Sequence, residues 1–119
     1  VRDYVHVCDI VDAHLLGLKW LENGGMSRAF CLGSGSGYSV REVIEEARRI
    51  TGRKVPVEIA PRRSGDAVRL VSGSMRASAE LGWHPKRTQL TTMIEDAWRG
   101  PRRLDKESVR LNRMVNASP

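Results

Sequence analysis

Apolar residues recur every three or four positions in four separate stretches of the chain, a spacing typical of helices that bury one face. The first predicted helix begins at Asp9, which is its expected N-cap, and ends at the Asn-Gly-Gly sequence that starts at residue 23. The other three helices are predicted over residues 39–52, 74–82 and 91–100. The pattern therefore predicts about four helices.

Residues at the ends of these stretches support the predicted boundaries. Ser39 and Glu42 have the S-x-x-E spacing of a capping box, and Gly52 closes the same helix. Gly82 stops the third helix, and Trp83 is expected to pack beneath it. The apolar face of the first helix is predicted to consist of Ile10, Val11, His14, Leu15, Leu18 and Leu21, with His14 as a satisfied core residue.

Three shorter segments have the composition of strands. They cover residues 2–7, 28–32 and 55–60 and are rich in Val, Ile and aromatic residues. Because these segments are interspersed with the helices, the predicted fold class is α/β. We expect a small mixed α/β region with about four helices and three short strands.

The length and composition of the chain fit one domain. At 119 residues it can bury a single core, and no apolar run approaches the roughly 18 residues of a membrane span. The first residues carry Arg2, Asp3 and His6 and show no signal peptide, so we expect a cytoplasmic protein without membrane contact. Cys8 and Cys31 are expected to be buried, reduced thiols.

The net charge of +6 is uneven along the chain. Residues 1–100 carry 15 basic and 12 acidic side chains, and residues 101–119 carry 5 and 2, so each part has a net charge of +3. The second part is predicted to be a basic tail, frayed or helical. Because the sequence lacks the spacing of RNA-binding motifs and zinc fingers, we expect no nucleic-acid binding.

The glycine stretch that begins at Gly33 has two interpretations. Gly33 and Gly35 match the first two glycines of the dinucleotide fingerprint G-x-G-x-x-G, but its sixth position is Tyr38. Starting at Gly35 instead places Val40 at that position. The residues are explained equally well by a flexible entry into a capped helix, so the pattern alone leaves a nucleotide loop and a turn open.

The sequence PRRSGD is the sharper candidate site. The planar guanidinium groups of Arg62 and Arg63 suit phosphate oxygens, and Asp66 could accept hydrogen bonds from ribose hydroxyls. Arg2, on the first predicted strand, could supply a second guanidinium to a diphosphate. The alternative is a pair of solvated arginines with a weak Arg–Asp ion pair on the surface.

Four stretches carry a family resemblance: VRDYVHVCDIVDAH, FCLGSGSGYSVREV, APRRSGD and AELGWHPKRTQL. In this order they resemble the C-terminal part of the UDP-glucose 4-epimerase (UDP-galactose 4-epimerase) family, in the extended short-chain dehydrogenase/reductase superfamily. The resemblance covers residues 1–100, which it implies to be the nucleotide-sugar-binding region of an epimerase. It also implies that the glycine stretch is a structural turn into a helix and not an NAD loop.

The resemblance implies particular roles for four residues. Arg2 and Arg63 match the family's diphosphate-contacting arginines, and Asp66 matches the acid that binds the uridine ribose. Tyr4 matches the tyrosine of the RDY motif near the nucleotide. The resemblance therefore implies a UDP-sugar as ligand. We predict no catalytic residue, cofactor-binding residue or metal ligand in this chain.

The resemblance implies that the family's chemistry lies in a Rossmann half that this sequence does not contain. That half binds NAD and supplies a Tyr-x-x-x-Lys pair for a 4-keto intermediate, so we expect the chain alone to be inactive. Its expected partner is the Rossmann half or another copy of itself, as a homo-oligomer. The alternative function is an epimerase-derived, non-catalytic interaction module that uses its basic surface.

Overall fold

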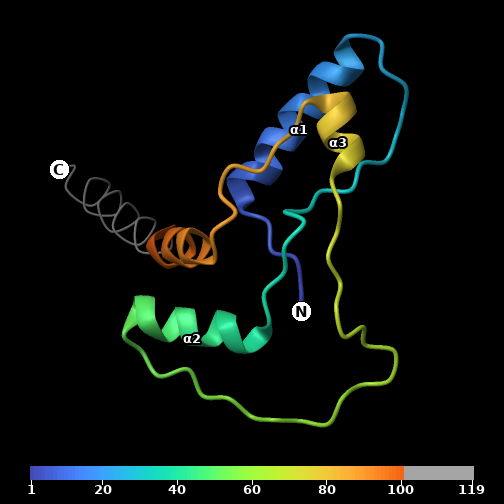
Figure 1. Cartoon of the computed structure of the whole chain (residues 1–119). Helices are drawn as coiled ribbons and strands as arrows, with labels where there is room; N and C mark the ends of the chain where they lie inside the picture. Colours follow the sequence, from blue (N-terminus) through green and yellow to red (C-terminus); the bar gives the residue numbers. More distant parts are fainter. Residues whose placement is uncertain (101–119) are drawn as a thin grey trace, which may run out of the picture.

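The computed structural model describes residues 1–100, and the predicted basic tail at 101–119 lies outside the described residues. Helix α1 covers Val7–Glu22, α2 covers Val40–Thr51 and α3 covers Met75–Leu81. Residues 90–100 are also helical (Figure 1, orange). The four predicted helices are therefore confirmed. Within this part of the chain, no helix is long and apolar enough to cross a membrane.

Helix α1 begins three residues earlier than predicted because its N-cap is His6 and not Asp9. The Nδ1 atom of His6 accepts a hydrogen bond from the backbone N–H of Cys8 at 3.1 Å. Asp9 is instead buried, with 1% of its surface exposed. Its carboxylate accepts the backbone N–H groups of Lys86 and Arg87, at 3.1 and 2.8 Å, and the Arg87 guanidinium at 3.1 Å. Asp9 therefore anchors the loop before the last helix to α1.

The core lies where α1 packs against α3 (Figure 1). It consists of Ala13 on α1, Ala77 on α3 and Trp83, which has 1% of its surface exposed. The indole Nε1 of Trp83 donates to the Asp9 carbonyl oxygen at 2.7 Å. Gly82 ends α3 in the left-handed conformation, with φ of 66°, and so turns Trp83 back under the helix as predicted.

Helix α2 has the predicted capping box and packs against the last helix. Ser39 accepts from the Glu42 N–H, and the Glu42 carboxylate accepts from the Ser39 N–H. Across the interface, the Thr91 hydroxyl donates to Glu46. The Arg53 guanidinium lies 5.2 Å from the centre of the Trp98 ring. These contacts join α2 to residues 90–100.

The three predicted strands are not confirmed. In residues 1–100 the only β pairing consists of two single-residue bridges, from Arg2 to Tyr38 and from Arg2 to Leu70. Residues 28–32 and 55–60 have no backbone–backbone hydrogen bonds within this part of the chain. A strand needs a ladder with a neighbour, and the alternation of apolar residues does not reveal whether that neighbour is present.

The predicted apolar face of α1 is correct as a pattern but is not in the core. His14 is exposed, and its Nδ1 lies 2.8 Å from the Ile10 carbonyl oxygen, so it is not a core histidine. The core side of α1 is the opposite one, which carries Asp9 and Ala13. The outward stripe, 50% to 66% exposed, consists of Val7, Val11, Leu15, Leu18 and Leu21.

The cysteines are free thiols, as expected, but they are not buried. Both Cys8 and Cys31 are exposed. Cys8 lies in the first turn of α1, next to the outward stripe, which explains why an apolar context in the sequence does not bury it.

The buried carboxylate of Asp9 yields the first testable prediction. Asp9→Ala leaves two backbone N–H groups and one guanidinium without their acceptor, so it should lower the free energy of unfolding by about 2–4 kcal/mol. The measurement is urea unfolding of both proteins. Asp12→Ala, on the same helix, is the control and should change stability by less than about 0.5 kcal/mol. Equal effects of the two substitutions would contradict this role of Asp9.

Candidate functional site

The candidate site is built around Arg2, in the extended segment before α1. Its backbone pairs with Tyr38 through two hydrogen bonds of 2.9 Å, and the neighbouring residues Val1 and Asp3 pair with Leu70 at 3.0 and 3.1 Å. Arg2 is therefore held between two segments that are distant in the sequence. This pairing fixes where its guanidinium points.

The guanidinium of Arg2 contacts the loop that contains Asp66. Its Nη2 donates to Asp66 Oδ1 at 2.5 Å, and its Nη1 donates to the carbonyl oxygens of Val1 and Ala67 at 3.0 and 2.9 Å. The side chains of Arg2 and Asp66 are 35% and 41% exposed. Two of the residues singled out from the sequence, 64 positions apart, are thus in direct contact.

The PRRSGD sequence forms a tight turn beside this pair. The Asp66 N–H donates to the Arg63 carbonyl oxygen at 3.3 Å, and Gly65 has a φ of 78°. Arg62 folds back and donates to the Asp66 carbonyl oxygen at 2.7 Å. Arg63 is exposed, and within residues 1–100 its guanidinium has no hydrogen-bond or ion-pair partner. It is therefore the arginine of this turn that can bind an anion without breaking an existing contact.

The glycine stretch wraps the carboxylate of Asp3. Asp3 Oδ1 accepts from the Ser34 N–H at 3.0 Å and from the Ser34 hydroxyl at 2.6 Å. Asp3 Oδ2 accepts from the N–H groups of Gly35 and Ser72, each at 3.2 Å. The backbone donors that could bind a phosphate already bind an anion of the chain itself.

Two glycines of this stretch are required by close packing. A Cβ atom at Gly33 would lie 2.3 Å from the Ser72 carbonyl oxygen, and one at Gly37 would lie 2.6 Å from a methyl group of Val1. Gly35 has a φ of 75°, which favours glycine. The stretch is therefore a turn around Asp3. Because its donors are occupied and its glycines are packed, these residues do not fit the phosphates of NAD.

The hydrogen bonds around Asp3 also set its acidity. Burial raises the pKa of the Asp3 carboxyl, but hydrogen bonds from the Ser34 hydroxyl and from the N–H groups of Ser34, Ser72 and Gly35 outweigh it. The net result is a pKa below the ordinary value of 3.8. The charged form of Asp3 is therefore part of the folded structure at neutral pH.

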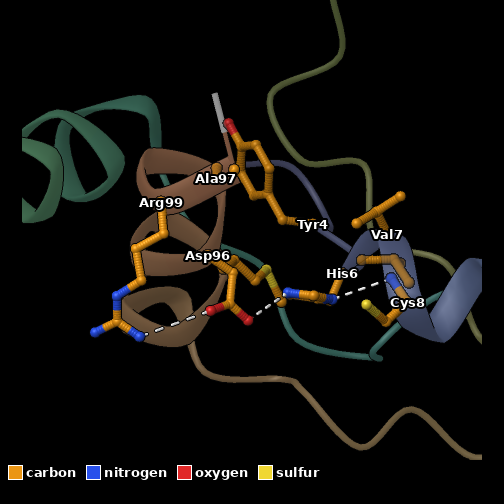
Figure 2. Close-up of a pocket in the computed structure, with 10 residues that line it drawn as sticks. Tyr4, His6, Val7, Cys8, Asp96, Ala97 and Arg99 are labelled. Carbon is orange, nitrogen blue, oxygen red and sulfur yellow. Dashed lines mark hydrogen bonds and ion pairs between the residues drawn. The ribbon is translucent and has the colours of Figure 1, made fainter. Parts of the chain in front are cut away.

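Tyr4 lies in a different place from the other three predicted site residues. It lines a cavity of about 950 Å³ together with His6, Cys8, Asp96 and Arg99 (Figure 2). Neither Arg2 nor the PRRSGD turn lines this cavity. The structure thus brings Arg2 and Asp66 together, leaves Arg63 on the same turn, and places Tyr4 elsewhere.

The cavity around Tyr4 holds no free imidazole base. His6 Nδ1 accepts from the Cys8 N–H, and Nε2 donates to Asp96 at 3.1 Å (Figure 2). These two bonds require the tautomer with the proton on Nε2 and leave no nitrogen to activate the Cys8 thiol. The pair of His6 and Asp96 therefore joins α1 to the last helix and does not form a catalytic dyad.

Comparisons with known proteins identify close relatives. A UDP-glucose 4-epimerase of Corynebacterium glutamicum is 51% identical over 98 residues, which is 82% of this chain and 30% of that protein. A crystal structure of a UDP-glucose 4-epimerase is 50% identical with a TM-score of 0.76 over 82% of this chain and 30% of that one. No model of a known protein family matches the chain.

A third comparison concerns an epimerase with its ligands. The UDP-glucose 4-epimerase from Stenotrophomonas maltophila, solved with bound NAD and formylated UDP-arabinopyranose, is 39% identical with a TM-score of 0.77. The match covers 89% of this chain and 31% of that protein. The chain thus spans about 30% of the length of the relatives that it matches.

The matched structures show the class of protein to which the fold belongs. The chain has part of the fold of nucleotide-sugar epimerases of the short-chain dehydrogenase/reductase type. Within that class, it matches the C-terminal part of UDP-glucose 4-epimerases. The predicted family resemblance is therefore confirmed.

Sequence reasoning missed the residues that hold the site together. Asp3 and Arg62 both shape the surroundings of Arg2 and Asp66, yet neither was assigned this role from the sequence. A charged residue inside a predicted strand, followed later by a Gly/Ser-rich stretch, is a pattern that could have indicated Asp3. The position of Arg62 next to Arg63 offers no comparable pattern, because either arginine could turn inwards.

The lowered pKa of Asp3 gives a pH prediction. Folding lowers the pKa of Asp3 from its ordinary value of 3.8, so the charged carboxylate stabilises the folded protein at pH values above 3.8. This contribution is lost as the pH falls through the lower pKa of the folded state. Asp3→Asn should cost about 1 kcal/mol at pH 7 and should unfold with a shallower pH dependence below pH 4. The measurement is the urea midpoint from pH 7 down to about pH 2.5.

The control for this experiment is Asp12→Asn, which removes a carboxylate without a hydrogen-bond partner among residues 1–100. It should keep the pH profile of the unchanged protein. If Asp3→Asn kept that profile too, the carboxylate would not be bound by the glycine turn.

Proposed function

We propose that this chain forms the part of a UDP-glucose 4-epimerase that holds the UDP end of the substrate. The observation that carries the proposal is the contact between Arg2 and Asp66, at 2.5 Å across 64 positions of sequence. A guanidinium and a carboxylate side by side offer a donor for phosphate oxygens and an acceptor for hydroxyl groups. A relative was solved with a UDP-sugar, which supports the same ligand class here.

In this proposal each polar residue has one role. Arg2 and Arg63 bind the diphosphate, because guanidinium groups form two parallel hydrogen bonds with phosphate oxygens. Asp66 accepts hydrogen bonds from the ribose hydroxyls. The role of Tyr4 near the nucleotide comes from the RDY motif alone, since Tyr4 lines the separate cavity beside His6.

The complete reaction is the interconversion of UDP-glucose and UDP-galactose through an NAD-dependent 4-keto intermediate. We assign this reaction to a complete epimerase, of which the chain supplies substrate binding. The sequence contains no Tyr-x-x-x-Lys pair, and both nitrogens of His6 are already engaged. Because general-base catalysis needs a proton acceptor within reach of the substrate, the chain by itself is expected to be inactive.

The outward stripe of α1 supports a second element of the proposal, which concerns partners. Five apolar side chains on one face of a helix, each at least half exposed, form a surface that folded proteins normally cover. Most of the length of each relative lies outside the match, so the rest of an epimerase is the natural cover. In the chain on its own, a second copy takes this place and gives a homo-oligomer.

Nucleotide binding is tested by calorimetric titration of UDP and of pyrophosphate at about 150 mM salt. UDP should bind saturably and more tightly than pyrophosphate, and Arg63→Ala should weaken UDP binding about tenfold or more. Arg41→Ala is the matched control, because Arg41 is exposed on α2 and has no partner among the described residues. It should leave UDP binding unchanged.

The opposite result would favour the interaction module. In that case UDP and pyrophosphate would bind equally, both arginine variants would weaken binding to the same extent, and binding would collapse with added salt.

The partner proposal is tested by sedimentation of the 119-residue chain. The chain should self-associate, because association removes the outward stripe of α1 from water. Leu15→Glu with Leu18→Glu should give a monomer, whereas Lys19→Glu, which changes charge on the same helix without touching the stripe, should not. A monomer in the unchanged chain would contradict the proposal.

A further inference from the structure

The contact between Arg2 and Asp66 has a consequence for selectivity. Without ligand, each of the two groups satisfies the other: Arg2 Nη2 donates to Asp66 Oδ1 at 2.5 Å. The remaining contacts of Arg2 are to the carbonyl oxygens of Val1 and Ala67 through Nη1. Nη2 carries a second N–H, and a phosphate oxygen that binds it would lie beside the carboxylate of Asp66.

Binding beside Asp66 has a different outcome for different ligands. An inorganic phosphate or pyrophosphate on Arg2 would compete with the Asp66 carboxylate for the guanidinium and would place a second anion next to it. That arrangement is disfavoured by like-charge repulsion. A nucleoside diphosphate with a ribose diol offers hydroxyl donors to that carboxylate, and these hydrogen bonds offset the repulsion.

We propose that the Arg2–Asp66 ion pair acts as a selectivity filter, which favours a ligand that brings both a diphosphate and a vicinal diol over one that brings phosphate groups alone. This inference rests on the proposed function for the identity of the binding residues. It goes further because it gives Asp66 two effects: its charge repels bare phosphate or pyrophosphate, and its oxygens accept hydrogen bonds from the diol of a nucleoside diphosphate. Specificity of this kind comes from a repulsive contact, not from an added attractive one.

The surroundings of the pair fit such a filter. Both side chains are partly exposed, at 35% and 41%, so a ligand can reach them without opening the core. The backbone of Asp66 is held independently, by Arg62 on its carbonyl oxygen at 2.7 Å and by the turn to Arg63. Arg2 is held by its pairing with Tyr38. The side chains can therefore separate while both backbones stay in place.

The test compares Asp66→Asn with Glu58→Gln, an exposed acid whose loss changes the net charge equally without touching the pair. The probes are pyrophosphate, UDP and 2′-deoxy-UDP, and the readout is the dissociation constant by calorimetry. Asp66→Asn should bind pyrophosphate about three- to tenfold more tightly than Glu58→Gln does. It should also lose the preference of the unchanged chain for UDP over 2′-deoxy-UDP.

A second pair of variants tests whether the tighter binding of pyrophosphate depends on Arg2. In an Arg2→Ala background, Asp66→Asn should give no gain in pyrophosphate binding over Glu58→Gln. Far-ultraviolet circular dichroism of each variant checks that the helices persist. A gain that survives without Arg2, or no gain of Asp66→Asn over Glu58→Gln, would overturn the filter.

The pyrophosphate arm separates this inference from the proposed function. Loss of UDP preference in the unchanged chain would reject the proposed function. The filter fails instead if pyrophosphate binds Asp66→Asn no better than it binds Glu58→Gln, whatever the affinity of UDP.

Discussion

The described structure depends on the hydrogen bonding of the extended segment before α1. Arg2 is paired on one side with Tyr38 and on the other with the segment at Leu70, while Asp3 binds the glycine turn. Further along, His6 contacts Asp96 on the last helix. One short segment thus joins parts of the chain that start at residues 34, 70 and 90. Figure 1 shows the first two of these parts, in teal and yellow-green, near the N-terminus.

The candidate site follows from this pairing. Leu70 is held next to Arg2, and Asp66 lies four residues before it, so the turn of PRRSGD reaches the Arg2 guanidinium. The glycine stretch holds the residue next to Arg2 by donating hydrogen bonds to the Asp3 carboxylate. The two adjacent charged residues therefore differ: the glycine turn encloses Asp3, whereas Arg2 contacts Asp66, and this contact carries the proposed nucleotide site.

The sequence predicted local features well and long-range ones unevenly. The capping box of α2 and the stop at Gly82 depend on neighbouring residues only, so their pattern was sufficient. The outward direction of the α1 stripe and the missing strand ladders were not predictable, because burial and pairing depend on what surrounds a segment. The sequence predicted that Arg2 and Asp66 contact the same ligand. It did not predict the ion pair between them, because two residues 64 positions apart give no spacing from which a contact can be inferred.

We propose that Arg2 and the PRRSGD turn form one nucleotide-binding surface. The most direct measurement is nuclear magnetic resonance of the ¹⁵N-labelled chain of 119 residues during titration with UDP. If they form one surface, UDP should cause saturable shifts of the backbone amides at residues 63–67 and of the Arg2 side-chain Nε–H, with α2 unchanged. Shifts that avoid these positions, or that spread over the basic side chains of α2 without saturation, would contradict it.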